Sequence, residues 1–455
     1  MRGVALAIAG LALAQLLRAP CRDSLDEVLM KYPFYHREVL HVFEQLNREA
    51  TTRPENPRVR VLDVVPFRRN GTVYYALTDP SRVSPGPVTL TAAGVRVLEL
   101  LDGSRSLDEV ARQASEQLPG TDTARQVRGL VRSLSTQLLL FDSGYRSAVI
   151  RVVNEFLKSS ERAPIARGGS YPEDGAAARA QLLGYLDGAK VDALDGKVSG
   201  LIAPHIDYQR GHATYARAYG ALRGLTGNER FIILGTAHNP GVRRFAATRK
   251  NYRTSLGTAV TDGDFLDRLA ARYPHPLFED EFLHRGEHSI ELEIPFLQVL
   301  FGPAVHIVPI LCGSLHDFFE PHTDPMSDPE VSAFVAALRQ TMAESPGENV
   351  VIAASDLSHM GPHFGDTFLM DDSRLAELDR RDRVLVDRIA AGDARGFAEA
   401  LSATNNSTRV CGAAPIYTLL QVLGSGVRVR VLDYRQCTDE EHFTTVTIPA
   451  AVITS

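Results

Sequence analysis

The chain has 455 residues, of which 44% are hydrophobic and 23% are charged, so it has the composition of a globular protein and the length for two or three domains. Its formal net charge is −6 and it contains no tryptophan, which argues against a basic or stacking surface for nucleic acid. The four cysteines form no CxxC pair. A disulfide scaffold is therefore excluded, and we expect a cytoplasmic protein in a reducing compartment.

Residues 1–56 are an N-terminal extension of uncertain role. The apolar run from Val4 to Leu17 follows Arg2 and resembles the h-region of a signal peptide. It is shorter than the roughly 20 apolar residues that cross a bilayer, and the cleavage site behind it is weak. A buried Ala/Leu helix is the alternative, and we expect no membrane span. Further along, apolar residues in the second half of residues 24–50 have helical spacing. The two prolines of TTRPENP then end this pattern.

Residues 57–145 form a compact unit, and residues 146–162 a linker. Two strands flank Asn70-Gly71, a dipeptide that favours a type I′ hairpin. A helix ending at Gly103 follows, and the next begins at Ser106 with the capping box SLDE. The segments LDGSRSLDEVA and LVRSLSTQLLLFD resemble the PqqD-like modules. That resemblance implies a small winged-helix-like α+β domain that contacts a peptide or a protein; a DNA-reading helix-turn-helix is the competing interpretation.

Residues 163–455 alternate between β-branched apolar runs and long segments with helical spacing. The runs include KVSGLIAPH, ERFIILGTAH, AVHIVPILCG, NVVIAASDLSH and VRVRVLDY. This alternation is typical of a mostly parallel sheet with flanking helices. We therefore predict an α/β fold for this region.

Histidines follow three of these strands directly. His205 ends the first run, His238 the second, and Asp356 with His359 follows a third. Ligands bind beyond the carboxyl ends of parallel strands, and neutral imidazole suits iron, copper or zinc. Cys411 precedes an apolar helix, where the helix dipole and free amides stabilise a thiolate, the form that binds metals. The alternative is that Cys411 is a buried, unreactive cysteine.

The segment HRGEHSIELEIPFLQVLFG predicts a helix from Ser289 to Phe301, with Glu287, His288 and Glu291 near its start. These groups either complement the helix dipole or orient ligands and move protons. DLSH is similarly ambiguous between a helix start capped by Asp356 and an acid/base pair. We take His288, His359 and Asp356 as catalytic candidates. Three other side chains are expected to be buried in the core: His306, Cys312 and Cys437.

Eight ordered motifs resemble the Memo-like family, protein B of the AmmeMemoRadiSam system. They are ARGGSYPED, LIAPHIDY, FIILGTAH, GEHSIELEIPFLQ, IVPILCG, ASDLSHMG, VCGAAP and VLDY. The resemblance covers residues 163–455 and implies a fold similar to class III extradiol dioxygenases. It also implies a metal site at His205, His238 and Cys411, and further cavity positions at Asp356, His359 and His288. Iron(II) is the first expectation, with copper or zinc as alternatives.

The sequence departs from the family pattern around these residues. Ile206 and Asp207 follow the first histidine, Asn239 stands where a second histidine often occurs, and Tyr171 is what remains of an aromatic pair. The resemblance further implies a radical-SAM protein and an AMMECR-type protein as partners.

Two functions remain open. The first is a metal-dependent oxidoreductase in which His359 or His288 moves protons. The second is a non-catalytic adaptor whose cavity binds a peptide or a modified side chain. A metal-assisted hydrolase is a third function, which the sequence favours less than these two.

Overall fold

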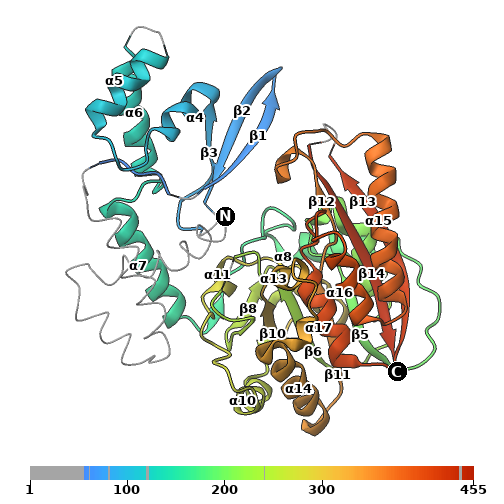
Figure 1. Ribbon diagram of the computed structural model, residues 1–455. Coiled ribbons are helices and arrows are strands. Elements are labelled where there is room, and N and C mark those ends of the chain that lie inside the picture. The colour runs from blue at the N-terminus through green and yellow to red at the C-terminus, as the bar shows by residue number, and fades with distance from the viewer. Residues whose placement is uncertain (1–55, 61, 80–81, 119–121, 240, 440–442) are drawn as a thin grey trace. The chain divides into compact units, whose positions relative to one another are not determined.

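The computed structural model describes residues 56–60, 62–79, 82–118, 122–239, 241–439 and 443–455 (Figure 1). The chain divides into two compact units, which meet in the sequence between Lys158 and Ser159. The apolar run at 4–17 and the helical pattern within 24–50 lie outside the described residues. In the ranges given above, no helix is both long enough and apolar enough to cross a membrane.

The N-terminal unit consists of an antiparallel sheet followed by helices. Asn70 and Gly71 have φ angles of 52° and 77°, as a type I′ turn requires, and join the first two strands as predicted. The predicted capping box is present, with Ser106 and Glu109 bonded to each other's backbone amides. The elements are β1 (Asp63–Arg69), β2 (Thr72–Thr78), β3 (Val88–Thr91), α4 (Ala92–Glu99), α5 (Leu107–Gln117), α6 (Thr123–Thr136) and α7 (Ser143–Lys158).

The C-terminal unit is built on a large, mostly parallel sheet (Figure 1). The order of its described strands is β12-β14-β5-β11-β6-β10-β9-β8-β4, with β13 paired to β14 and β7 to β10. The strands are β4 (Glu161–Arg162), β5 (Val198–Ala203), β6 (Arg230–Thr236), β7 (Phe245–Ala247), β8 (Asn251–Thr254), β9 (Gly257–Thr261), β10 (His306–Cys312), β11 (Asn349–Ala354), β12 (His359–Met360), β13 (Arg428–Thr438) and β14 (Thr445–Thr454). The central pairs β5–β11, β11–β6 and β6–β10 are parallel, whereas β14 runs antiparallel to β5.

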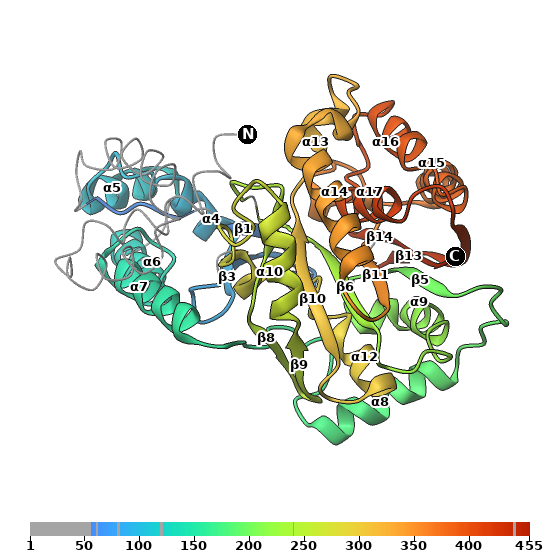
Figure 2. The same ribbon diagram turned by 90° about the horizontal axis from the view of Figure 1, so that it is seen from below.

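Helices cover both faces of this sheet (Figure 2). One face carries α10 (Gly263–Arg272), α14 (Pro329–Glu344), α15 (Asp372–Ala390), α16 (Ala394–Ser402) and α17 (Ala413–Leu423), and the other α8 (Gly175–Asp187), α9 (Tyr208–Gly220) and α12 (Ile294–Phe301). Alternate residues of β6 enter the two cores: Ile232 and Leu234 pack on one face, Phe231 and Ile233 on the other. The mixed α/β architecture with a mostly parallel sheet is thereby confirmed. Short helices are α11 (Leu283–Gly286), α13 (His316–Phe319) and the 3₁₀ turns Pro325–Ser327 and Pro362–Phe364.

Two local predictions were wrong. The helix expected from Ser289 begins only at Ile294, because Pro295 lacks an amide hydrogen and is tolerated only in the first helical turn. Residues 289–293 form turns instead. His306, expected in the core, is the exposed first residue of β10, where the strand enters the sheet.

Candidate metal centre

The carboxyl ends of three adjacent strands define the site. β5, β11 and β6 lie side by side, run parallel and are in register at these ends. His205, Asp356 and His238 follow two residues after the last residues of β5, β11 and β6 respectively. The strand-end pattern of the sequence therefore brings the three side chains to one edge of the sheet.

His205 is held from both sides and is only 2% exposed. Its Nδ1–H donates to the carbonyl oxygen of Ala354 at 2.9 Å, and its backbone N–H donates to Asp356 Oδ1 at 2.9 Å. A carbonyl oxygen can only accept a hydrogen bond, so the Nδ1 proton is fixed and Nε2 becomes the metal-binding nitrogen. Nε2 lies 3.3 Å from Cys411 Sγ.

His238 is oriented by Glu287, a nearly fully buried carboxylate. Nδ1 of His238 lies 3.0 Å from Glu287 Oε1, and the backbone N–H of His238 donates to Oε2 at 2.9 Å. Burial would raise the pKa of Glu287, but the imidazoles of His238 and His288 hold that pKa well below its ordinary value. The carboxylate therefore fixes Nδ1 as the protonated nitrogen of His238 and turns Nε2 toward the site.

Cys411 is placed by close packing at the start of α17. A Cβ added to Gly412 would overlap the carbonyl oxygen of Asp356 and the side chain of Ser355. Only glycine therefore permits the amide of residue 412 to reach the Asp356 carbonyl, at 3.0 Å. This contact brings the thiol beside His205.

The metal-free site is a thiolate surrounded by imidazoles. Burial favours the neutral thiol, but His205, His359 and His238 together lower the pKa of Cys411 to about 5. Burial likewise opposes charge on His205, yet Asp356 and Cys411 raise its pKa to about 9. The pKa of His238 is also raised, because Glu287 and Cys411 outweigh the effect of burial. A metal ion would take the place of the protons that these groups share.

The donor set fits a transition metal. One ligand atom from each of His205, His238 and Cys411 lies within 4.8 Å of the other two. Two imidazoles and one thiolate form a ligand set that suits iron, copper or zinc. Because the side chain of His238 is 36% exposed, the site has an open side at His238.

His288 lies beside the three proposed ligands. Its ring stacks on His238 with centroids 4.8 Å apart and lies 5.6 Å from the His205 ring. A second group, His238, Glu287 and His288, also has metal-ligand spacing. However, Glu287 Oε1 already accepts the amides of His288 and Ser289 at 2.8 and 3.0 Å. We therefore interpret Glu287 as an orienting residue, which is one of the two roles that sequence analysis left open.

Asp356 and His359 are both near the site, and each has its own partners. Asp356 faces His205, with Oδ2 lying 3.7 Å from Nε2. His359 Nδ1 lies 3.0 Å from the carbonyl oxygen of Leu357, and its ring packs edge-on against Phe364. Residues 355–358 are irregular and His359 begins β12, so Asp356 does not cap a helix. His359 is close enough to Cys411 to lower its pKa.

A buried ion pair supports the loop behind His238. Arg162 pairs with Glu291 and also donates to the carbonyl of Glu287. Glu291 accepts a hydrogen bond from the hydroxyl of Tyr171 at 2.6 Å and from the amides of residues 165 and 166. Glu291 is therefore a structural residue, and this contact explains the position of Tyr171.

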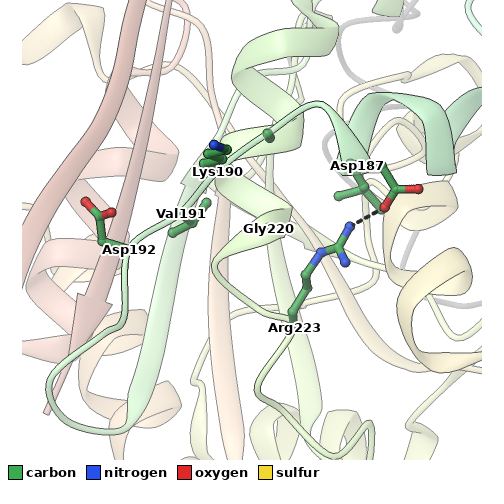
Figure 3. Close-up of a pocket in the computed structure, with 8 residues that line it drawn as sticks. Asp187, Lys190, Val191, Asp192, Gly220 and Arg223 are labelled. Carbon is green, nitrogen blue, oxygen red and sulfur yellow. Dashed lines mark hydrogen bonds and ion pairs between the residues drawn. The ribbon is translucent and has the colours of Figure 1, made fainter.

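Other candidates lie away from the chemistry. Asp207 caps α9 and forms an ion pair with Arg210, so its carboxylate is engaged in these two contacts. Cys312 and Cys437 are buried, as expected. A pocket of about 430 Å³ is lined by Asp187, Arg223 and neighbouring residues (Figure 3). It lies beyond the ends of α8 and α9, where the chain enters β5 and β6, so it is at the opposite edge of the sheet from the histidines.

Comparisons with known proteins agree with the motif order. The family model described as Memo-like protein matches residues 162–453. A MEMO1 family protein of Aquifex aeolicus is 24% identical over 381 residues, covering 83% of this chain and 94% of that protein. One from Thermus thermophilus is 29% identical over 320 residues, covering 70% and 90%, and one from Methanopyrus kandleri is 29% identical over 265 residues, covering 56% and 84%.

The Aquifex match covers more of the chain than the Memo-like region contains, so it extends into the N-terminal unit. The family model itself spans well over half of the residues. The chain belongs to the Memo-like protein family.

Proposed function

We propose that this protein is a non-haem metal-dependent oxidoreductase whose metal is held by His205, His238 and Cys411. The observation that carries the proposal is the convergence of these three ligand atoms within 4.8 Å. The other ring nitrogen of each histidine, Nδ1, already has a hydrogen-bond acceptor. This acceptor is the Ala354 carbonyl oxygen for His205 and the Glu287 carboxylate for His238. Hydrogen-bond acceptors that orient the ligands in this way are typical of metal sites in proteins.

Iron(II), or copper as the alternative, would supply one-electron redox chemistry with dioxygen at these ligands. Zinc would fit the same donors but would supply no redox step. A thiolate in place of a carboxylate donates more charge, so ring cleavage of the extradiol type does not follow from the likeness in fold class alone. The open side at His238 is where a substrate would approach.

Two histidines are in place to exchange protons with a bound substrate. In His359 the contact to the Leu357 carbonyl fixes Nδ1 as a donor, so Nε2 is the atom available for proton exchange. In His288, Nδ1 lies 3.3 Å from Glu287 Oε1, which directs Nε2 away from that carboxylate. Asp356 holds the His205 backbone and so keeps one ligand in position.

The test is oxygen consumption by the iron(II)-loaded full chain with ascorbate as the reductant. We expect the parent to consume oxygen above the rate of free iron, and His205→Ala/His238→Ala to fall to that rate. His306→Ala is the matched control, because His306 is exposed at the amino end of β10. Equal oxygen consumption in the parent and the ligand variant would exclude this function.

The adaptor function has one observation in its favour. In the described part of the N-terminal unit, β1 and β3 are edge strands of their sheet, and edge strands can pair with an extended peptide. Under this alternative, the radical-SAM and AMMECR-type partners expected from the family would bind through residues 57–145. Deleting that range should then abolish their capture by the protein while metal binding is unchanged. Capture that survives the deletion would contradict the adaptor function.

A further inference from the structure

Asp382 is a carboxylate in an otherwise apolar helix stripe. The buried face of α15 comprises Leu378, Asp382, Leu385, Val386 and Ile389. Asp382 is 0% exposed, whereas Asp387 of the same helix is exposed. A buried carboxylate is costly unless hydrogen bonds compensate for the water it loses. Its position therefore depends on its partners.

Those partners are hydroxyls from three separate segments. The hydroxyl of Ser358 donates to Asp382 Oδ1 at 2.6 Å, and the hydroxyl of Tyr434 donates to Oδ2 at 2.9 Å. Burial raises the pKa of Asp382, and the hydroxyls of Ser358, Thr447 and Tyr434 oppose this effect. Ser358 lies between β11 and β12, Tyr434 in β13 and Thr447 in β14. One carboxylate thus joins α15 to the strands and to the segment that carries His359.

Ser358 is the last residue of an irregular segment that joins β11 to β12 next to the metal site. Residues on either side of it hold His205 and approach Cys411: Asp356 bonds the His205 amide, and His359 lowers the pKa of Cys411. Residues 355–358 have no helical or strand structure of their own. The segment is held instead by contacts to residues 408 and 447, including the Ser358 amide to Thr447 Oγ1 at 2.8 Å.

The two hydroxyls that meet Ser358 have compatible proton directions. Thr447 Oγ1 accepts the Ser358 amide, so its own proton is available for Asp382. Ser358 gives its proton to Asp382 and accepts from Thr408, whose Oγ1 lies 2.8 Å away. The hydroxyl hydrogens of Ser358 and Tyr434 therefore point toward the carboxylate of Asp382, and that of Thr408 points toward Ser358.

We propose that Asp382 is a positioning residue that acts through Ser358 to hold the neighbouring His359, whose amide donates to the Thr408 carbonyl at 2.7 Å, in place at the metal site. This inference rests on the proposed function, because His359 matters only if the site performs proton-coupled chemistry. Asp382 touches neither a metal ligand nor a substrate position, and its effect is transmitted by the 356–359 segment.

The test compares Asp382→Asn and Ser358→Ala with Asp387→Asn, in the iron-loaded full chain. Both test variants should retain stoichiometric iron, because the contacts of Asp356 to the amides of His205 and Gly412 are separate from those of Ser358. Their ascorbate-driven oxygen consumption should fall about tenfold, a modest part of what a positioned proton donor contributes. Asp387→Asn should match the parent.

A double-mutant cycle separates positioning from general stability. Adding Asp382→Asn to His359→Gln should cause little further loss, because the residue through which Asp382 acts is already gone. Independent losses that multiply in the double variant would overturn the proposal. So would the loss of iron in Asp382→Asn alone.

A metal-free measurement keeps the inference separate from the proposed function. Diethyl pyrocarbonate should modify His359 faster in Asp382→Asn than in Asp387→Asn, with His306 as the internal reference, measured by peptide mass spectrometry. An unchanged His359 rate would overturn the positioning role whether or not iron binds. Failure of the parent to bind iron or consume oxygen would instead count against the proposed function.

Discussion

At the scale of single residues, Glu287 decides which way His238 faces. Glu287→Gln should lower iron(II) affinity about 10- to 100-fold, the usual cost of losing a residue that orients a ligand. The amide would also place an NH₂ group against a backbone N–H, because both carboxylate oxygens of Glu287 accept backbone amides. The measurement is anaerobic competition with a chromogenic chelator.

The matched control for this change is Glu348→Gln, since Glu348 is an exposed residue paired with Lys197. It should bind iron as the parent does. Parent-like affinity in Glu287→Gln would show that His238 is oriented without its carboxylate partner.

Metal binding should displace protons from the histidines. Asp356 and Cys411 raise the pKa of His205 to about 9 despite its burial, so this imidazole is protonated at neutral pH without metal. Cys411, with a pKa of about 5, is already a thiolate and contributes little above pH 6. Affinity should therefore rise between pH 6 and 9, by on the order of tenfold per pH unit for each proton displaced, and then level off.

Anaerobic calorimetric titration with cobalt(II) between pH 6 and 8, in buffers of different ionisation enthalpy, measures both affinity and proton release. Cobalt(II) is suitable because it does not oxidise readily during the titration. Affinity that stays constant across this range would contradict the protonated metal-free site.

The sequence singled out the three side chains that the structure brings together, but not the residue that orients one of them. His205 and His238 follow strands, and Cys411 precedes a helix, that β-branched and apolar runs make visible. The role of Glu287 depends on a loop conformation that no periodicity encodes. The sequence feature that pointed to Glu287 was its position directly before His288. That position was equally compatible with a helix-dipole role.

At the scale of elements, the contact between α17 and the end of β11 sets the position of Cys411. Gly412→Ala should cost about 1–3 kcal/mol of stability, because its Cβ would overlap Asp356 and Ser355 and the helix must move. The same shift should weaken metal binding. Urea unfolding and iron titration of the variant measure the two effects.

Gly184→Ala in α8 is the matched control, because an added Cβ there meets nothing within 4 Å. It should leave stability unchanged or raise it by about 0.5–1 kcal/mol, as expected for alanine in a helix. Equal behaviour of the two variants would show that the packing at Gly412 does not place the thiol.

The wrong helix prediction at Ser289 and the DLSH segment, which the sequence left open, have a common cause. Apolar spacing from Ser289 to Phe301 fits a helix, yet Pro295 limits α12 to residues after 293. DLSH looks like a helix start, but backbone contacts to residues 408 and 447 keep it irregular. Both segments are determined by distant partners, which a local pattern does not contain.

At the scale of the whole molecule, alternating strands and helices predicted the class of the C-terminal unit but not its strand order. The sheet places β11 between β5 and β6. Residues about 150 positions apart in the chain, such as His205 and Asp356, therefore meet at one edge of the sheet. The antiparallel β14 next to β5 was also not predictable, because pairing depends on long-range contacts. The region that matches the family model contains all three proposed ligands.

The central claim is that this edge binds one redox metal. The most direct measurement is an anaerobic iron(II) titration of the full chain with elemental analysis, beside His205→Ala/Cys411→Ala and the His306→Ala control. We predict stoichiometric iron in the parent and the control, and none in the double variant. Equal iron in all three proteins, or no iron in a correctly folded parent, would contradict the claim.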